Sequence, residues 1–171
     1  MLEPGALIIL SRRLVRDAAR EAETVIRDAY LQRAVSTAYY AVFHMLIQAA
    51  TDRFIGSGHL HTPTACILYR GFDHRTMRTV CDDLQKPTIK DKYKQLLRRT
   101  AVSPSMRQFS VSFPALQDHR HAADYDPQAK LEPSQASEIV DEAVKCMLAF
   151  GSADTGEQAD VLALLLVGAR G

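Results

Sequence analysis

The feature that most constrains the fold is a stretch of 18 residues without a charged side chain, at positions 34–51. This length approaches that of a membrane-spanning helix, but five polar side chains interrupt the stretch. They are Ser36, Thr37, Tyr40, His44 and Gln48. The apolar residues between them recur at three- and four-residue steps and form two stripes. We therefore expect a helix over residues 30–52 that is buried on two sides of a soluble domain, and no membrane partner.

The composition favours an all-α class. The chain of 171 residues has 23 alanines against 8 glycines and 7 prolines, and alanine is the best helix former. This length suits one domain with a packed core. The three cysteines are odd in number and lack the spacing of zinc ligands, and no cationic segment precedes the short apolar stretch near the amino terminus. We expect a cytoplasmic protein without a cofactor.

Helical periodicity predicts an antiparallel bundle of four to five helices over residues 5–150. The expected helical ranges are Gly5 or Ala6 to Ala29, 30–52, 64–84 with an interruption at Gly71, 115–125 and 134–150. Within residues 87–104 we expect a short, very basic helix that gives way to a Ser/Pro turn. Pro114 is expected in the first turn of the helix over 115–125. Residues 151–171 are expected to form a linker and a short apolar C-terminal helix, with Thr155 and Gln158 as a capping box.

Charge is distributed unevenly, although the chain has 21 basic and 20 acidic residues in total. Residues 70–99 hold nine Lys or Arg against four Asp, whereas residues 126–171 hold three basic and eight acidic residues. The near-neutral total argues against general binding of nucleic acids or membrane surfaces. The basic segment could pair with the acidic one across a bundle or a dimer, or it could contact phosphates.

Polar side chains follow one face of the uncharged helix, because Ser36, Tyr40, His44 and Gln48 lie at four-residue steps. Buried polar groups usually meet a hydrogen-bond partner, so the stripe could be satisfied inside the bundle. The alternative is that the first three of these side chains line a cleft.

The densest cluster of chemically active side chains is the string DHRHAADYDP at residues 118–127. Helical spacing pairs Arg120 with Asp124, and it pairs His121 with Tyr125. These pairs could be an ordinary surface ion pair and an aromatic contact, or they could belong to a site. A metal site is not expected, because His59 and His61 form only a lone pair of histidines in a loop.

Two strings together resemble the HEPN family, in its small stand-alone prokaryotic form. They are RAVSTAYYAVFH at residues 33–44 and RHAADYDP at residues 120–127, followed by a helix that ends at Phe150. The resemblance implies a helical bundle that forms a homodimer, so that two copies of the Arg-containing motif meet in one cleft. Many such domains are metal-independent endoribonucleases. Many are encoded beside a minimal nucleotidyltransferase as a toxin–antitoxin pair.

The resemblance gives Arg120 the role of binding phosphate, with Asp124 orienting it and Tyr125 contacting phosphate or a base. During RNA cleavage an arginine stabilises the charge that builds on the phosphate oxygens. The ribonuclease motif of the family has a His four to six residues after the Arg, where this chain has Tyr125. A phenol with an ordinary pKa near 10 is a poor base at neutral pH. Proton transfer would therefore fall to His121 or His44, if either faces the cleft.

Three functions of different classes follow. The first is a homodimer that binds RNA or a nucleotide phosphate between its subunits, with or without metal-independent endoribonuclease activity in a toxin–antitoxin or defence system. The second is a non-catalytic interaction module that partners a minimal nucleotidyltransferase. The third is a helical scaffold whose working surface is the apolar segment Leu162–Val167.

Overall fold

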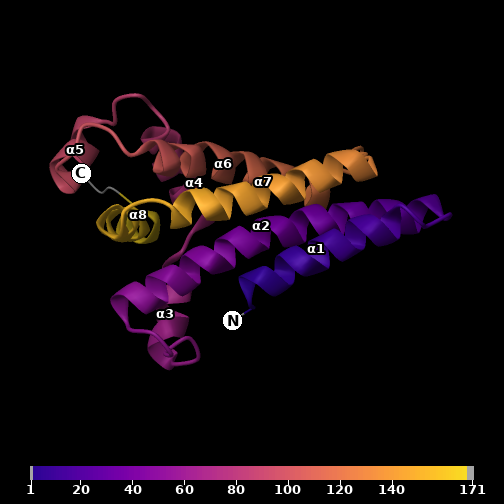
Figure 1. Cartoon of the computed structure of the whole chain (residues 1–171), viewed down its shortest axis with the longest axis horizontal. Coiled ribbons are helices and arrows are strands. Elements are labelled where there is room, and N and C mark those ends of the chain that lie inside the picture. Colours follow the sequence, from indigo (N-terminus) through magenta and orange to yellow (C-terminus); the bar gives the residue numbers. More distant parts are fainter. Residues whose placement is uncertain (1, 169–171) are drawn as a thin grey trace.

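The computed structural model describes residues 2–168, and within them the chain forms eight helices and no strand. The all-α class is confirmed. The four long helices are α1 (Pro4–Ala18), α2 (Thr24–Phe54), α6 (Pro104–Tyr125) and α7 (Pro133–Gly151). They lie side by side, with α1 antiparallel to α2 and α6 antiparallel to α7 (Figure 1). The shorter helices lie in the half of the molecule where α2 ends: α3 (Pro63–Gly71), α4 (His74–Leu84), α5 (Asp91–Leu97) and α8 (Thr155–Val167).

Helix α2 is the centre of the bundle. Its 31 residues span about 46 Å, and it packs against α1, α6 and α7. Most of the uncharged stretch is buried, which confirms the expectation of a helix covered on two sides. Within the described residues no helix is both long and apolar enough to cross a membrane.

The expected first helix divides into two, because α1 stops at Ala18 and α2 begins at Thr24. The apolar periodicity ran across this boundary without a glycine or proline to mark it. The structure shows that the periodicity does not represent one buried stripe, since Val25 is 75% exposed and Leu10 is 45% exposed. The chain reverses here so that α1 can pack along α2, and tertiary packing overrides the local helix propensity.

Helix α6 begins eleven residues before the expected start, so Pro114 lies inside the helix and not in its first turn. Ser103 caps α6 by accepting a hydrogen bond from the Met106 N–H.

The expected capping box of α8 is replaced by other contacts. Asp154 accepts from the first backbone N–H groups of α8, while the Gln158 side chain donates to carbonyls at the end of α7. The interruption expected at Gly71 is present, because α3 ends there.

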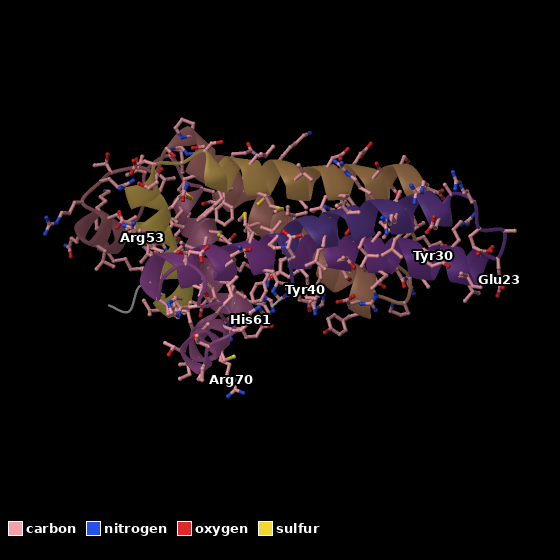
Figure 2. The ribbon with its side chains drawn as sticks, turned by 60° about the horizontal axis from the view of Figure 1, so that its bottom comes forward. Glu23, Tyr30, Tyr40, Arg53, His61 and Arg70 are labelled. Carbon is pink, nitrogen blue, oxygen red and sulfur yellow. The ribbon has the colours of Figure 1, made fainter. Side chains whose placement is uncertain are left out.

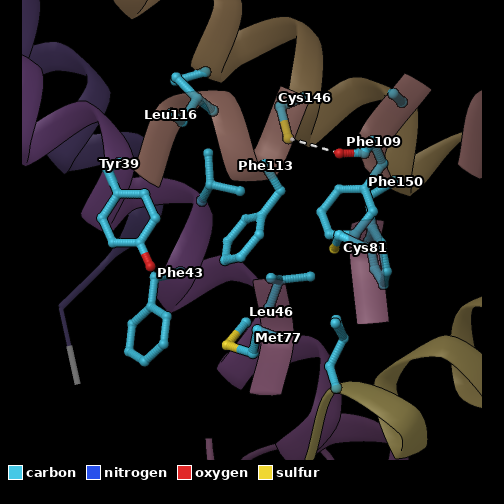
Figure 3. Packing of buried hydrophobic residues seen from close by; sticks show 14 of the residues in the cluster. Tyr39, Phe43, Leu46, Met77, Cys81, Phe109, Phe113, Leu116, Cys146 and Phe150 are labelled. Carbon is cyan, nitrogen blue, oxygen red and sulfur yellow. Dashed lines mark hydrogen bonds between the residues drawn. The ribbon is translucent and has the colours of Figure 1, made fainter. Parts of the chain in front are cut away.

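A hydrophobic core joins the helices, and its large members include aromatic and aliphatic side chains (Figure 3). Phe109 contacts Phe113 and Phe150, with ring centroids 5.8 and 5.2 Å apart. Full burial of each such side chain contributes roughly 1.5–3 kcal/mol to the free energy of unfolding.

Cys81 and Cys146 are buried in the same core, and burial raises the pKa of both thiols. These two cysteines therefore behave as small apolar side chains.

The basic and acidic segments meet within the chain. Arg99 contacts the buried Glu157 at 2.9 Å and Asp160 at 3.1 Å, and Glu157 also accepts a hydrogen bond from the Ser103 N–H. These contacts attach α8 to the loop that precedes α6. The last part of the expected C-terminal region, residues 169–171, lies outside the described residues.

Candidate functional site

Two segments that are about 80 residues apart in sequence meet between α2 and the C-terminal half of α6. The Ser36 hydroxyl donates a hydrogen bond to the Asp124 carboxylate. One step of four residues further along α2, the hydroxyl of Tyr40 accepts a hydrogen bond of 2.8 Å from Nη2 of Arg120. Both strings that carry the family resemblance therefore contribute to one cluster of side chains.

Arg120 is held from several sides. Its Nε lies 2.8 Å from Oδ2 of Asp124, one turn later in α6; this N–H makes no directed hydrogen bond, so the contact is an ion pair. Its guanidinium carbon is 5.5 Å from the centre of the Tyr40 ring and 5.3 Å from that of Tyr125. The Arg120 and Asp124 side chains are only 18% and 17% exposed. They are therefore more buried than an ordinary surface ion pair.

The surroundings keep Arg120 charged. Burial alone would lower its pKa, but Tyr40 and Asp124 act in the opposite direction and raise the pKa above the ordinary value of arginine. Nη1 of Arg120 makes no hydrogen bond to the described residues. The cluster therefore holds a permanent cation in a fixed place with one end of its hydrogen-bonding fork available.

A cavity of about 490 Å³ opens at this cluster, and we call it the Arg120 groove. Its lining residues are Ala29, Gln32, Arg33, Tyr40, Arg120, Ala123, Asp124 and Tyr125. The volume is in the range of ligand-binding clefts. Arg33 is exposed and forms no ion pair within the described residues. Two arginines face one carboxylate in this groove, so it favours an anionic ligand.

The structure places two of the expected site residues outside the Arg120 groove. His44 is buried beside Phe43 and Tyr69 and lines a different cavity, next to α3. His121 is exposed, and its ring centroid lies 5.0 Å from that of Tyr125, but it is not among the lining residues. Of the polar stripe on α2, Ser36 and Tyr40 therefore join the Arg120 cluster, and His44 does not.

Gln32 and Arg33 were not predicted as site residues from the sequence. The signal was available, because residues 29, 33, 36 and 40 are spaced by four, three and four and so share one face of α2. His74 was also missed: its Nδ1 lies 2.6 Å from the Tyr39 hydroxyl. Burial lowers the pKa of His74, and the charge of Arg120 lowers it further. No local pattern could show this contact, because it depends on α4 packing beside the bundle.

Figure 2 shows Tyr40 midway along α2, away from both ends of the helix. Within residues 2–168 no group of three or more His, Cys, Asp or Glu side chains could hold a metal ion. Comparison of the chain with models of protein families, with curated proteins and with solved structures finds no match. An account of function therefore depends on the Arg120 groove and on the two strings that form it.

Proposed function

We propose that this protein is a HEPN-like homodimer that binds RNA through its phosphates in the Arg120 groove. The observation that carries the proposal is the fixed Arg120 guanidinium, which Tyr40 and Asp124 hold in a cavity that also contains the unpaired Arg33. Guanidinium groups bind phosphate oxygens through charge-assisted, often bidentate hydrogen bonds.

Single-stranded RNA is favoured as the form of the ligand because an aromatic ring stands beside the two arginines. Tyr125 is 63% exposed and lines the groove. Bases of a single strand can stack on such a ring, whereas bases in a duplex are already stacked. Asp124 accepts from Ser36 and pairs with Arg120, so its role is to position the cation.

A second copy of the chain is favoured as the cover of the groove. Val25 lies one turn before the lining residue Ala29 on α2, and it is 75% exposed. Ile26 and Tyr125 are further exposed apolar side chains on the same two helix ends. Burying such side chains against a partner is favourable, and twofold symmetry would bring two Arg120 grooves together.

Binding without strand cleavage is favoured over a ribonuclease. No histidine lines the Arg120 groove within the described residues, so the groove lacks the side chain that most often transfers protons at neutral pH. A non-catalytic module fits this lining. A minimal nucleotidyltransferase as its partner is an implication of the resemblance only.

The test is fluorescence anisotropy of a labelled single-stranded RNA with chelator present. We expect Arg33→Ala to weaken binding several-fold, since it removes a phosphate contact, and Arg120→Ala to weaken it by about tenfold or more. Arg13→Ala is the matched control, because Arg13 is an exposed arginine on α1 outside the groove. Equal affinities for all four proteins would overturn the proposal.

The same samples test cleavage. RNA that stays intact on a denaturing gel supports binding alone, whereas metal-independent cleavage that disappears in Arg120→Ala would identify an endoribonuclease. Arg33→Ala isolates the loss of a phosphate contact, because Arg120→Ala also removes an intrachain ion pair.

A further inference from the structure

A second cavity, of about 510 Å³, lies where α3 meets α2 and the start of the chain; we call it the α3 pocket. Its lining residues are Leu2, His44, Leu60, Ala65, Cys66, Tyr69 and Arg70. None of them lines the Arg120 groove. Figure 2 shows α3 with Arg70 projecting from the side of the bundle, at a distance from Tyr40.

His44 forms the inner wall of the α3 pocket and is only 8% exposed. Its Nδ1 is sealed from solvent and has no hydrogen-bond partner within the described residues. Burial lowers the pKa of His44, so the ring is neutral at pH 7. An unsatisfied polar group on a buried side chain is costly in a stable fold. The pocket therefore has a neutral imidazole ring in its wall, and the unpartnered Nδ1 lies behind the pocket surface.

The outer wall combines an aromatic ring with a free cation. The Tyr69 ring stacks on His44, with 6.2 Å between centroids and 24° between planes, and Tyr69 is 41% exposed. Arg70 is exposed and forms no ion pair within the described residues. Leu2, Leu60 and Ala65 supply an apolar floor. The lining thus suits a flat ring that bears a negative charge.

We propose that the α3 pocket binds a nucleotide, with the base against Tyr69 and His44 and the phosphate at Arg70. Stacking on an aromatic side chain accepts any base, and the guanidinium of Arg70 is matched to phosphate. The nucleotide is either free or part of an RNA. Tyr40 and His44 are one turn apart on α2, about 6 Å along the axis, so one RNA strand could reach both sites. An RNA nucleotide as the ligand of the α3 pocket rests on the proposed function, whereas a free nucleotide does not.

The first test titrates the full chain with AMP, adenosine and inorganic phosphate by calorimetry. We expect AMP to bind, and Tyr69→Ala and Arg70→Ala each to weaken it by about tenfold or more. Adenosine should bind the unmodified protein as weakly as AMP binds Arg70→Ala. Both side chains are exposed, so melting curves should match those of the unmodified protein, and Arg13→Ala should leave AMP binding unchanged.

The second test measures a short single-stranded RNA against the same variants. Weaker RNA binding in Arg70→Ala identifies an RNA nucleotide as the ligand, whereas an effect on AMP alone identifies a free nucleotide. The inference is overturned if Tyr69→Ala and Arg70→Ala change neither affinity, or if AMP and adenosine bind equally well. Failure of the proposed function has a different signature, which is RNA binding that does not respond to Arg33→Ala.

Discussion

Arg120 combines two roles in one side chain. It pairs with Asp124 on its own helix and donates to Tyr40 on α2, so it joins α2 to α6 as well as facing the groove. The spacing of four residues predicted the pair with Asp124. Its burial could not be predicted, because Tyr40 and Ser36 come from a helix 80 residues away in sequence.

The first prediction concerns the strength of this pair. A double-mutant cycle on Arg120→Ala and Asp124→Ala, measured by urea denaturation, should give a coupling free energy of about 1–3 kcal/mol. The cycle on Arg12 and Asp141 is a matched control, because that pair has a similar distance of 3.1 Å but is 59% and 52% exposed. Its coupling should stay below about 1 kcal/mol. Equal coupling free energies for the two pairs would contradict the view that burial strengthens the ion pair between Arg120 and Asp124.

The second prediction concerns pH. Burial holds the pKa of His44 and of His74 below 6.5 in the folded chain, so the unfolded chain binds more protons between the folded value and 6.5. The stabilising contribution of both neutral rings is complete above pH 6.5 and is lost as the pH falls through the folded values. We expect the melting temperature to fall between pH 7 and pH 5.

His74→Gln should make this pH dependence shallower, because it removes one titrating ring. The pKa values of Asp73 and Asp118 are also lowered by their hydrogen bonds, but these groups titrate at a lower pH, below about 4. A profile between pH 7 and pH 5 that is equally steep in His74→Gln would show that His74 does not contribute.

At the scale of helices, the sequence predicted the elements whose ends carry local signals. Helix α7 agrees closely with expectation because Pro133 opens it and Gly151 closes it. The α1–α2 boundary could not be predicted, since residues 19–23 contain neither glycine nor proline. Pro114 misplaced the start of α6, because a proline is more common in a first helical turn than inside a helix. Here Pro114 lies inside α6 and is buried.

The third prediction concerns the attachment of α8. Glu157 is buried and serves both Arg99 and the Ser103 N–H, so Glu157→Gln should lower the free energy of unfolding by about 1–3 kcal/mol. Asp160→Asn is the matched control, because Asp160 contacts the same arginine but is 42% exposed. Its effect should be below about 1 kcal/mol. A larger loss of unfolding free energy in Asp160→Asn than in Glu157→Gln would contradict this prediction, because it would show that Asp160 and not Glu157 attaches α8.

At the scale of the whole molecule, α2 links two cavities with different linings. The Arg120 groove is polar and cationic, whereas the α3 pocket is apolar with one arginine at its edge. The sequence placed Ser36, Tyr40 and His44 on one face, but it could not show that this face meets α6 along one part and α3 along the next. Only the packed arrangement of the shorter helices separates the two sites.

The fourth prediction concerns assembly. If a second copy covers the Arg120 groove, Val25→Asp should shift the molar mass measured by light scattering from that of a dimer to that of a monomer, because it places a charge in an apolar contact. Leu148→Asp is the matched control. Leu148 is 64% exposed but lies on α7, away from the groove, so this variant should stay dimeric. Dissociation by Leu148→Asp alone would move the interface to α7.

The permanent contact between Arg120 and Asp124 has a consequence for kinetics. If the Arg120 groove binds phosphate as proposed, an incoming phosphate meets a guanidinium whose charge is already partly neutralised, and it must share that cation with a carboxylate that stays in place. The net electrostatic gain on arrival is therefore smaller than at an arginine without an ion pair, which shortens the residence time of each contact more than it slows arrival. A groove built in this way suits repeated brief sampling of many strands rather than lasting capture of one.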